Sequence, residues 1–447
     1  MDRGPQQPLI LEPESPKSIP EVLPGLCLSQ EQWLVLQRLE QFTQSEEKLY
    51  LLTGYAGVGK TTLLQALITR LRQQGDKRDI VLTAFSNKAT KVLSMMASRW
   101  RLDVDTMTCC KLLGLRPVID EQTGTQVFQP ERHQDSQIQR YDFVVVDECS
   151  MINKEMWGLL VQTVSSLYGR TQLLFVGDPA QLPPVGERQS PCFSQIYHRS
   201  DLTEVVRYGG AIALLAEDVR QNLGRHHFPR FQSDVNPDFT AGSFVTRRHQ
   251  WEKLLIRAFT SQVYQQDPDQ VRALAYTNRR VNQLNQLIRA AIYGKGVPRF
   301  VSGERLMANN PCVEADTILL QTSAECEVLE AVEGQTGPWA VWRLEVETED
   351  NQYRTLRVLH EKSLTEFQLK LQSYAEEKRW LEFWELKQLF HDVSYAYSLT
   401  IHKSQGSTFQ DVFVDLPNMM VNRNIMERNQ LCYVAFTRAA NRLFLYQ

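Results

Sequence analysis

The segment that most constrains this chain is at residues 54–61, which read GYAGVGKT and match the pattern GxxxxGK[ST]. Before it, residues 49–53 form an apolar run that predicts a buried strand, and a helix is expected to begin near Thr61. Glycines let successive backbone N–H groups converge on phosphate oxygens, and the helix N-terminus adds positive potential. The chain is therefore expected to contain an α/β sheet with a nucleoside triphosphate site.

Each polar group of this loop has an expected partner on the nucleotide, which we take to be ATP. Lys60 bridges the outer phosphates, and the hydroxyl of Thr61 is a ligand for Mg²⁺. The residues expected to contact the nucleotide here are Gly54, Gly57, Val58, Gly59, Lys60, Thr61 and Thr62.

A second motif supplies carboxylates. Residues 143–146 predict a buried strand that ends in Asp147 and Glu148. Asp147 is expected to hold Mg²⁺, and Glu148 to orient or deprotonate the attacking water. Together the two motifs indicate either a nucleotide hydrolase or a nucleotide-controlled switch.

Further buried-strand runs alternate with helical stretches, which predicts parallel βαβ units in two lobes. Lobe one takes the runs already named and residues 80–85 and 173–176; lobe two takes residues 271–277, 393–399, 412–414 and 442–446. Ser29 is expected to cap a helix that extends through Glu40.

Two insertions interrupt this rhythm. The polar residues 114–140 predict a β-hairpin that turns at Gly124. Residues 303–360 predict a small β-barrel, and residues 364–390 one long helix. Trp380 and Trp384, one turn apart, are expected to pack this helix onto its own lobe.

The expected domains follow from these breaks. Residues 1–25 hold six prolines and predict a disordered tail. Lobe one spans 26–225 and includes the hairpin at 114–140; lobe two spans 226–302 and 391–447 and is interrupted by the insertion at 303–390.

Composition sets broad limits. A chain of 447 residues with 43% apolar residues is long enough for more than one core. The net charge of −3 gives no global basic signal, so any nucleic-acid binding must use local clusters. The eight cysteines form no CxxC pair, and no apolar run reaches the length of a membrane span. These features favour a soluble cytoplasmic protein, associated with the nucleoid if the source is bacterial.

The most specific string is LLFVGDPAQLPPV at residues 173–185, which resembles motif III of superfamily 1 helicases. Residues 400–408, TIHKSQGST, resemble motif V of the RecD-like and phage Dda helicases, and residues 433–439, YVAFTRA, resemble motif VI. The motifs occur in the family's order from residue 28 to the end of the chain. The resemblance implies two RecA-like parallel-sheet lobes, an inserted hairpin that acts as a strand-splitting pin, and the β-barrel insertion with its long helix.

The resemblance also assigns nucleotide roles. Gln181 senses the γ-phosphate, and Gln32, in LSQEQ, reads adenine. Arg207, in LTEVVR, reaches the γ-phosphate, and Arg438 is an arginine finger that stabilises charge on the transferred phosphoryl group.

A further set of residues is expected to contact a nucleic-acid strand. Residues 83–90 resemble motif Ia, which grips the strand backbone, and motif V supplies a second grip. The expected contacts are Phe85, Ser86, Asn87, Lys88, Thr108, Thr400, His402, Lys403 and Ser404. Phe85 and Ser86 stand where the family often has Pro-Thr, and Cys109 and Cys110 replace polar and His residues beside the pin.

By this resemblance the chain is an ATP-dependent motor that moves 5′-to-3′ on single-stranded DNA and opens duplex junctions. Its expected partners are single-strand-binding or repair proteins, and it is expected to act as a monomer. Two alternatives stay open: an RNA helicase of the same superfamily, and an ATP-switched clamp that binds DNA without moving along it. No residues are left over for a fused nuclease domain.

Overall fold

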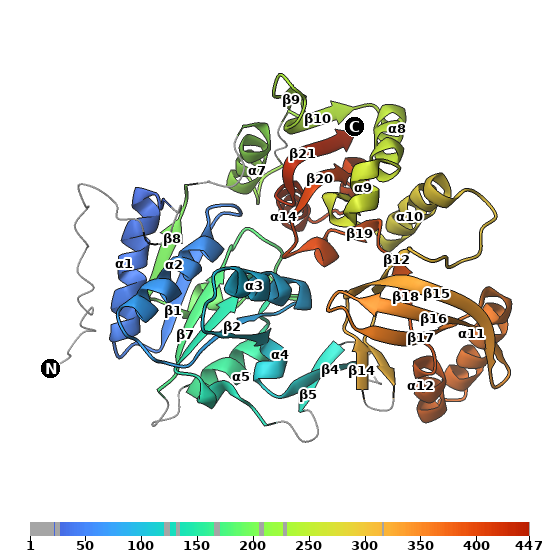
Figure 1. Cartoon of the computed structure of the whole chain (residues 1–447), viewed down its shortest axis with the longest axis horizontal. Helices are drawn as coiled ribbons and strands as arrows, with labels where there is room; N and C mark the ends of the chain where they lie inside the picture. The colour runs from blue at the N-terminus through green and yellow to red at the C-terminus, as the bar shows by residue number, and fades with distance from the viewer. Residues whose placement is uncertain are drawn as a thin grey trace. The chain divides into compact units, whose positions relative to one another are not determined.

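The structure is a computed structural model that describes residues 22, 27–119, 126–130, 135–164, 170–204, 210–226, 230–314 and 317–446 (Figure 1). The chain divides into two compact units. Unit 1 comprises Met1–Pro117 and Phe128–Leu223, and unit 2 comprises Val118–Val127 and Gly224–Gln447. In the described part of the chain, no helix has both the length and the apolar character that a membrane span requires.

Unit 1 contains a six-stranded sheet in the order β3-β2-β6-β7-β1-β8, and all its strand pairs are parallel. The strands are β1 (Leu49–Gly54), β2 (Ile80–Ala84), β3 (Asp105–Thr108), β6 (Phe143–Asp147), β7 (Gln172–Gly177) and β8 (Arg199–Leu202). The four strands predicted for lobe one are confirmed. The short edge strands β3 and β8 were not predicted, since they lack a continuous apolar run.

Helices cover both faces of this sheet, because successive side chains along its strands point to opposite faces and both sets are apolar. In β6, Phe143 and Val145 pack in one apolar core, while Val144 and Val146 pack in the other. The first core includes α1 (Gln30–Gln44), α2 (Lys60–Gln73) and α3 (Asn87–Arg99); the second includes α4 (Cys109–Leu112), α5 (Lys154–Val164) and α6 (Cys192–Gln195). Val22 is buried in the first core, so one residue of the expected tail is packed; the rest of residues 1–25 lies outside the described residues.

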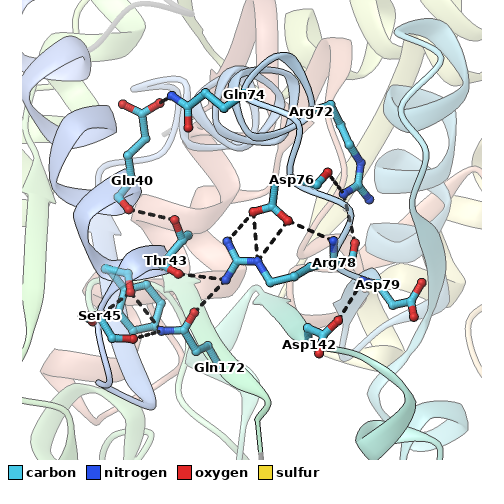
Figure 2. Close-up of polar contacts among 11 residues, drawn as sticks. Glu40, Thr43, Ser45, Arg72, Gln74, Asp76, Arg78, Asp79, Asp142 and Gln172 are labelled. Atoms are coloured by element: carbon cyan, nitrogen blue, oxygen red, sulfur yellow. Dashed lines mark hydrogen bonds and ion pairs between the residues drawn. The ribbon is translucent and has the colours of Figure 1, made fainter.

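A cluster of polar side chains lies at the amino ends of strands in unit 1 (Figure 2). The amide nitrogen of Gln172, the first residue of β7, donates to the carbonyls of Phe42 at 2.9 Å, Ser45 at 3.1 Å and Glu47 at 2.9 Å. Its amide oxygen accepts from Arg78 at 3.1 Å. The end of α1 is therefore tied to the start of β7 by one buried side chain.

Arg78 is the centre of the same cluster (Figure 2). It donates to the carbonyl of Thr43 at 2.8 Å and pairs with the carboxylate of Asp76 at 2.6 Å. Burial alone would raise the pKa of Asp76, but hydrogen bonds from Arg78 outweigh it and hold this pKa below its usual value.

Unit 2 has a second six-stranded sheet, in the order β19-β11-β20-β21-β10-β9. Its pairs are parallel except that β9 runs antiparallel to β10. The strands are β9 (Asp234–Val235), β10 (Gly242–Thr246), β11 (Val271–Ala275), β19 (Ser398–Thr400), β20 (Phe409–Val414) and β21 (Ala439–Tyr446). Helices α8 (Arg248–Phe259), α9 (Gln262–Gln266) and α10 (Asn278–Tyr293) pack in one apolar core with β11, β20 and β21. Helix α14 (Ile425–Phe436), which contacts β20 and β21, is buried on every side from Asn429 onward.

The insertion in unit 2 is an antiparallel five-stranded sheet in the order β17-β16-β15-β12-β18. These strands are β12 (Arg305–Ala308), β15 (Glu325–Thr336), β16 (Trp339–Thr348), β17 (Tyr353–Leu359) and β18 (Val393–Tyr395), beside a hairpin of β13 (Cys312–Glu314) and β14 (Thr317–Leu320). The N–H of His391, just before β18, donates to the carbonyl of Arg357 in β17 at 2.7 Å, so the two sheet edges approach each other. The expected β-rich insertion is confirmed as an antiparallel sheet.

Two buried ion pairs join this insertion to strand β11 and helix α10 of unit 2. Arg272 of β11 lies 3.2 Å from the carboxylate of Glu325, and Arg289 of α10 lies 2.6 Å from that of Glu304. All four side chains are at most 9% exposed. Removing one partner of such a pair leaves an uncompensated buried charge, so the junction is sensitive to single substitutions.

The prediction of a single long helix at residues 364–390 is wrong. The segment forms α11 (Glu361–Glu376) and α12 (Trp380–Gln388), separated by Lys378 at φ 56°. The N–H of Arg379 donates to the carbonyl of Tyr374 at 2.8 Å, which is the C-terminal capping bond of a helix that ends in a left-handed residue. Of the two tryptophans, Trp384 is buried, whereas Trp380 is 48% exposed.

The prediction of a single strand at residues 393–399 is also wrong. It is divided into β18, in the antiparallel sheet, and β19, in the parallel sheet. Between them the buried Ala396 accepts a hydrogen bond from Arg272, so an apolar run continues through a change of sheet. The hairpin expected at residues 114–140 is present as the paired strands β4 (Leu115–Ile119) and β5 (Gln126–Pro130); its turn at Gly124 lies outside the described residues.

Replacing Gln172 by Leu tests the polar cluster. The variant should lose about 1–3 kcal/mol of unfolding free energy, because the carbonyls of Phe42, Ser45 and Glu47 lose a donor in one buried and two part-buried hydrogen bonds. Chemical denaturation followed by circular dichroism measures this loss. The control is Gln74→Leu at an exposed position of the same cluster, which should change stability by less than about 0.5 kcal/mol. Equal effects of the two substitutions would contradict the role given to Gln172.

Candidate nucleotide and strand-binding sites

The carboxyl ends of three adjacent parallel strands gather the expected catalytic residues of unit 1. The strands β6, β7 and β1 are neighbours in the sheet. The loop after β1 leads to Lys60 and Thr61, β6 ends at Asp147 before Glu148, and the loop after β7 holds Gln181. Crevices at the carboxyl ends of parallel strands are the usual place for ligands in such sheets.

The glycine-rich loop has the backbone that its sequence requires. Gly57 and Gly59 have φ of 80° and 83°, a left-handed conformation that side chains with a Cβ rarely adopt. A Cβ on Gly59 would also lie 2.7 Å from the amide nitrogen of Gln32. The Lys60 ammonium donates to the carbonyls of Gly54 and Tyr55, each at 2.9 Å, so it is held against the loop that would bind phosphate.

Gln32 joins this loop to the start of α1. Its amide nitrogen donates to the carbonyl of Val58 at 2.8 Å, and its amide oxygen accepts from the N–H of Ser29 at 2.9 Å. Ser29 caps α1 in return by accepting from the N–H of Gln32, so the helix start predicted at Ser29 is confirmed. Gln32 is 5% exposed and adjoins the nucleotide loop.

The carboxylate pair occupies a tight turn after β6. The Asp147 carboxylate accepts from the N–H of Glu148 at 2.8 Å, and Glu148 has φ 52° and ψ 41°. A non-glycine residue in this left-handed region raises the conformational free energy by about 1–2 kcal/mol, which contacts with the surrounding structure must offset. The next residues pass so close to β7 that a Cβ on Gly177 would lie 2.6 Å from the Cys149 sulfur.

The oxygen atoms offered by Thr61 and Asp147 suit Mg²⁺. Magnesium prefers hard oxygen donors and is commonly held by one or two protein ligands together with phosphates and water. Within the described ranges there is no cluster of three or more His, Cys, Asp or Glu side chains that could hold a metal by itself. A hydroxyl and a carboxylate beside the phosphate loop therefore fit a magnesium ion that arrives with the nucleotide.

The loop after β7 is ordered by Asp178, whose side chain is 0% exposed. Its carboxylate accepts from the N–H of Ala180 at 3.0 Å, and its carbonyl accepts from the N–H of Gln181 at 3.1 Å. Arg220 also lies 3.2 Å from this carboxylate. Sequence reasoning missed Arg220, because it is in an ordinary amphipathic helix, α7 (Ala211–Gln221), and belongs to none of the recognised strings.

The strand-binding residues expected in unit 1 follow two neighbouring strands. Ala84 of β2 pairs with Thr108 of β3, so the segment 85–88 and Thr108 lie at one edge of the sheet. Ser86 and Thr108 use their hydroxyls to cap α3 and α4. Phe85 meets Phe128 of β5 edge to face at 6.1 Å between ring centroids, and Asn87 and Lys88 begin α3.

The motif V residues of unit 2 have different degrees of exposure. His402 is exposed, whereas Ser404 is fully buried and donates to the carbonyl of Ile401 at 2.8 Å. The hydroxyl of Thr400 accepts from the N–H of Lys403 at 3.3 Å. Ser404 and Thr400 therefore bond within the loop, and among the four expected contact residues His402 is exposed and Lys403 is partly exposed.

Lys403 is bonded to the insertion. Its ammonium donates to the side-chain oxygen of Asn309 at 2.9 Å, and the amide nitrogen of Asn309 donates to Asp392 at 3.0 Å. Burial lowers the pKa of Lys403, and the carboxylate of Asp392 acts in the opposite direction. The cation of motif V and the antiparallel sheet thus share one hydrogen-bonded chain.

Arg438 is 5% exposed at the end of α14. It donates to the carbonyls of Val434 at 3.0 Å and Ser407 at 2.9 Å, and to the hydroxyl of Thr437 at 3.2 Å. The bond to Ser407 ties motif VI to the motif V loop. Arg207 lies outside the described residues, so its expected contact with the γ-phosphate stays a prediction.

Comparison with known proteins agrees with this arrangement. The family model described as an AAA domain matches residues 37–187, and the UvrD-like helicase C-terminal domain matches residues 395–446. The ATP-dependent DNA helicase dda of Enterobacteria phage T4 is 25% identical over 430 residues, covering 88% of this chain and 93% of that protein. RecBCD enzyme subunit RecD of Mycolicibacterium smegmatis is 28% identical over 204 residues, covering 41% of this chain and 35% of that protein.

Solved structures share the fold. Pif1 helicase at forked double-stranded DNA superposes with a TM-score of 0.52 and 15% identity, covering 94% of this chain and 92% of that one. Pif1 helicase from Bacteroides in complex with ADP-AlF3 and single-stranded DNA gives a TM-score of 0.51 with the same identity and coverage. The sequence matches and the order of the motifs thus make this chain similar to the superfamily 1 helicases Dda and RecD, and the Pif1 structures share its fold.

Proposed function

We propose that this chain is an ATP-dependent DNA helicase that moves 5′-to-3′ along single-stranded DNA and separates duplex strands at a junction. The observation that carries the proposal is the gathering of Lys60, Glu148 and Gln181 at the carboxyl ends of three neighbouring strands. The similarity to the T4 protein, an ATP-dependent DNA helicase, supports it.

In this proposal the unit 1 residues bind and activate ATP. Lys60 and the backbone N–H groups of the loop hold the phosphates, and Gln32 reads the base. Glu148 orients the attacking water or takes its proton, and Gln181 contacts the γ-phosphate. A magnesium ion held by Thr61 and Asp147 neutralises charge on the phosphate oxygens when it is bound.

For unit 2 the proposal follows the helicase resemblance, in which two RecA-like lobes act on one nucleotide. Arg438 stabilises charge on the transferred phosphoryl group, and Arg207, from the end of lobe one, reaches the same phosphate. ATP then favours a closed arrangement of the lobes, because both contact its γ-phosphate; hydrolysis removes that shared ligand and the lobes separate.

Alternating binding of the DNA strand by the two lobes would convert this cycle into movement along the strand. The proposed contacts are the motif Ia residues with Thr108 in lobe one, and His402 and Lys403 in lobe two. If the lobes hold the strand with different strength when closed and open, each ATP hydrolysed gives one directed step. The hairpin of β4 and β5 would split the duplex, and the inserted antiparallel sheet, closed as a small barrel, would guide the strand.

The domain limits proposed for this motor are a tail at 1–25, lobe one at 26–225, lobe two at 226–302 with 391–447, and the insertion at 303–390. We further propose that it acts as a monomer and works beside single-strand-binding or repair proteins.

Replacing Lys60 by Ala tests the phosphate site. Single-stranded DNA should stimulate ATP hydrolysis by the native chain, and the variant should lose at least about 100-fold in kcat, because a cation on the transferred phosphate is removed. A coupled-enzyme ATPase assay measures both rates. Lys77→Ala, at an exposed lysine of the same unit, is the matched control and should keep normal turnover. Normal turnover by Lys60→Ala would refute the assignment.

Strand displacement tests substrate and direction together. Fluorescent duplexes with a 5′ or a 3′ single-stranded tail, made of DNA or of RNA, are incubated with the chain and ATP. We expect displacement of the 5′-tailed DNA duplex and none of the 3′-tailed one. Preference for RNA would favour the RNA-helicase alternative, and ATP hydrolysis without any displacement would favour the switched clamp.

A further inference from the structure

Arg220 lies between two loops of the candidate nucleotide site. Its guanidinium carbon is 3.6 Å from the centroid of the Tyr55 ring, and one of its terminal nitrogens is 3.2 Å from the Asp178 carboxylate. Tyr55 belongs to the phosphate loop, and Asp178 begins the loop that carries Gln181. The Arg220 side chain is 19% exposed, so both contacts are largely shielded from water.

The contact with Asp178 reaches Gln181 through the backbone. Asp178 accepts from the N–H of Ala180 with its carboxylate and from the N–H of Gln181 with its carbonyl. Asp178 and Gln181 are 0% and 4% exposed, so this turn has little room for alternative arrangements. A shift of the Asp178 side chain would therefore move the residue that contacts the γ-phosphate in the proposed function.

The contact with Tyr55 reaches Lys60 in the same way. The carbonyl of Tyr55 accepts from the Lys60 ammonium at 2.9 Å, and its N–H donates to the carbonyl of Leu202 at 3.3 Å. The Tyr55 ring also packs against the first apolar core. The stacked guanidinium therefore covers a residue whose backbone helps to place the phosphate-binding lysine.

Arginine is suited to this position in a way that lysine is not. A planar guanidinium can lie over an aromatic face while its N–H groups, which point outward in the guanidinium plane, bond a carboxylate beyond the edge of the ring. A lysine ammonium could neutralise Asp178 but would not stack on Tyr55 in the same geometry. Charge compensation and positioning can thus be separated by substitution.

We propose that Arg220 is a positioning residue that fixes the Gln181 loop relative to the phosphate loop. The proposal rests on the proposed ATP hydrolysis at this site and adds a residue of α7 to it. Arg220 acts on the reaction through Tyr55 and Asp178, so its loss changes the placement of Lys60 and Gln181 together.

The test is Arg220→Lys, measured by steady-state ATP hydrolysis at saturating single-stranded DNA and by thermal unfolding. We expect kcat to fall by about 10-fold to 100-fold, because a small misplacement of catalytic groups costs rates of this order. The KM for ATP should change by less than about threefold, since the backbone N–H groups that would hold the phosphates are all retained. The unfolding midpoint should stay near that of the native chain, since Asp178 keeps a cation.

Two further comparisons make the result specific. Tyr55→Leu, which removes the ring, should lose more kcat than Tyr55→Phe, and the double variant Tyr55→Leu with Arg220→Lys should lose no more than the worse single variant. The matched control is Arg99→Lys, at an exposed arginine 5.9 Å from the Trp100 ring, which should behave as the native chain does.

The outcomes separate this inference from the proposed function. If the native chain hydrolyses ATP and Lys60→Ala does not, but Arg220→Lys keeps its kcat, the positioning role is overturned and the site assignment stands. A fall in kcat that is matched by a fall in the unfolding midpoint would also overturn it, because Arg220 would then be purely structural. If the native chain hydrolyses no ATP, the proposed function itself fails.

Discussion

The structure depends on one constraint: a parallel sheet whose two faces are both covered by helices. Each central strand of unit 1 is apolar along its length, so polar groups can enter only where the strands end. Because β6, β7 and β1 are parallel neighbours, their carboxyl ends coincide, and the polar loops that carry Lys60, Glu148 and Gln181 lie together. At the amino ends, Gln172 at the start of β7 and Arg78 just before β2 are bonded to the carbonyls at the end of α1.

The same logic continues in unit 2, where separate motifs are joined by buried polar contacts. Arg438 reaches the carbonyl of Ser407, and Lys403 reaches Asn309 of the inserted sheet. The insertion is also fixed by the ion pairs of Arg272 and Arg289. In the proposed motor, a change at the arginine finger would therefore have a short covalent and hydrogen-bonded route to the strand-binding loop and to the insertion.

The sequence predicted the parts of the fold that depend on local pattern. Continuous apolar runs located the central strands, and Ser29 located the start of α1 because a capping hydroxyl acts within one helical turn. Tertiary contacts decided the rest. The run at 393–399 changes sheets at Ala396. Helix α11 ends at Glu376 and is followed by Lys378 in a left-handed conformation, although no glycine or proline occurs there. Arg220 was missed for the same reason, because its contacts are with Tyr55 and Asp178, which are far from it in sequence.

In the proposed motor, one triphosphate would be contacted by charged residues of both lobes. The most direct measurement is the distance between a spin label on exposed Gln73 of α2 and one on exposed Glu385 of α12, recorded with and without ADP and aluminium fluoride. The account predicts that this transition-state mimic changes the distance distribution to a narrower, closed population in the native chain and leaves it unchanged in Lys60→Ala. A distribution that is the same with and without the mimic, in a native chain shown to bind it, would contradict the account.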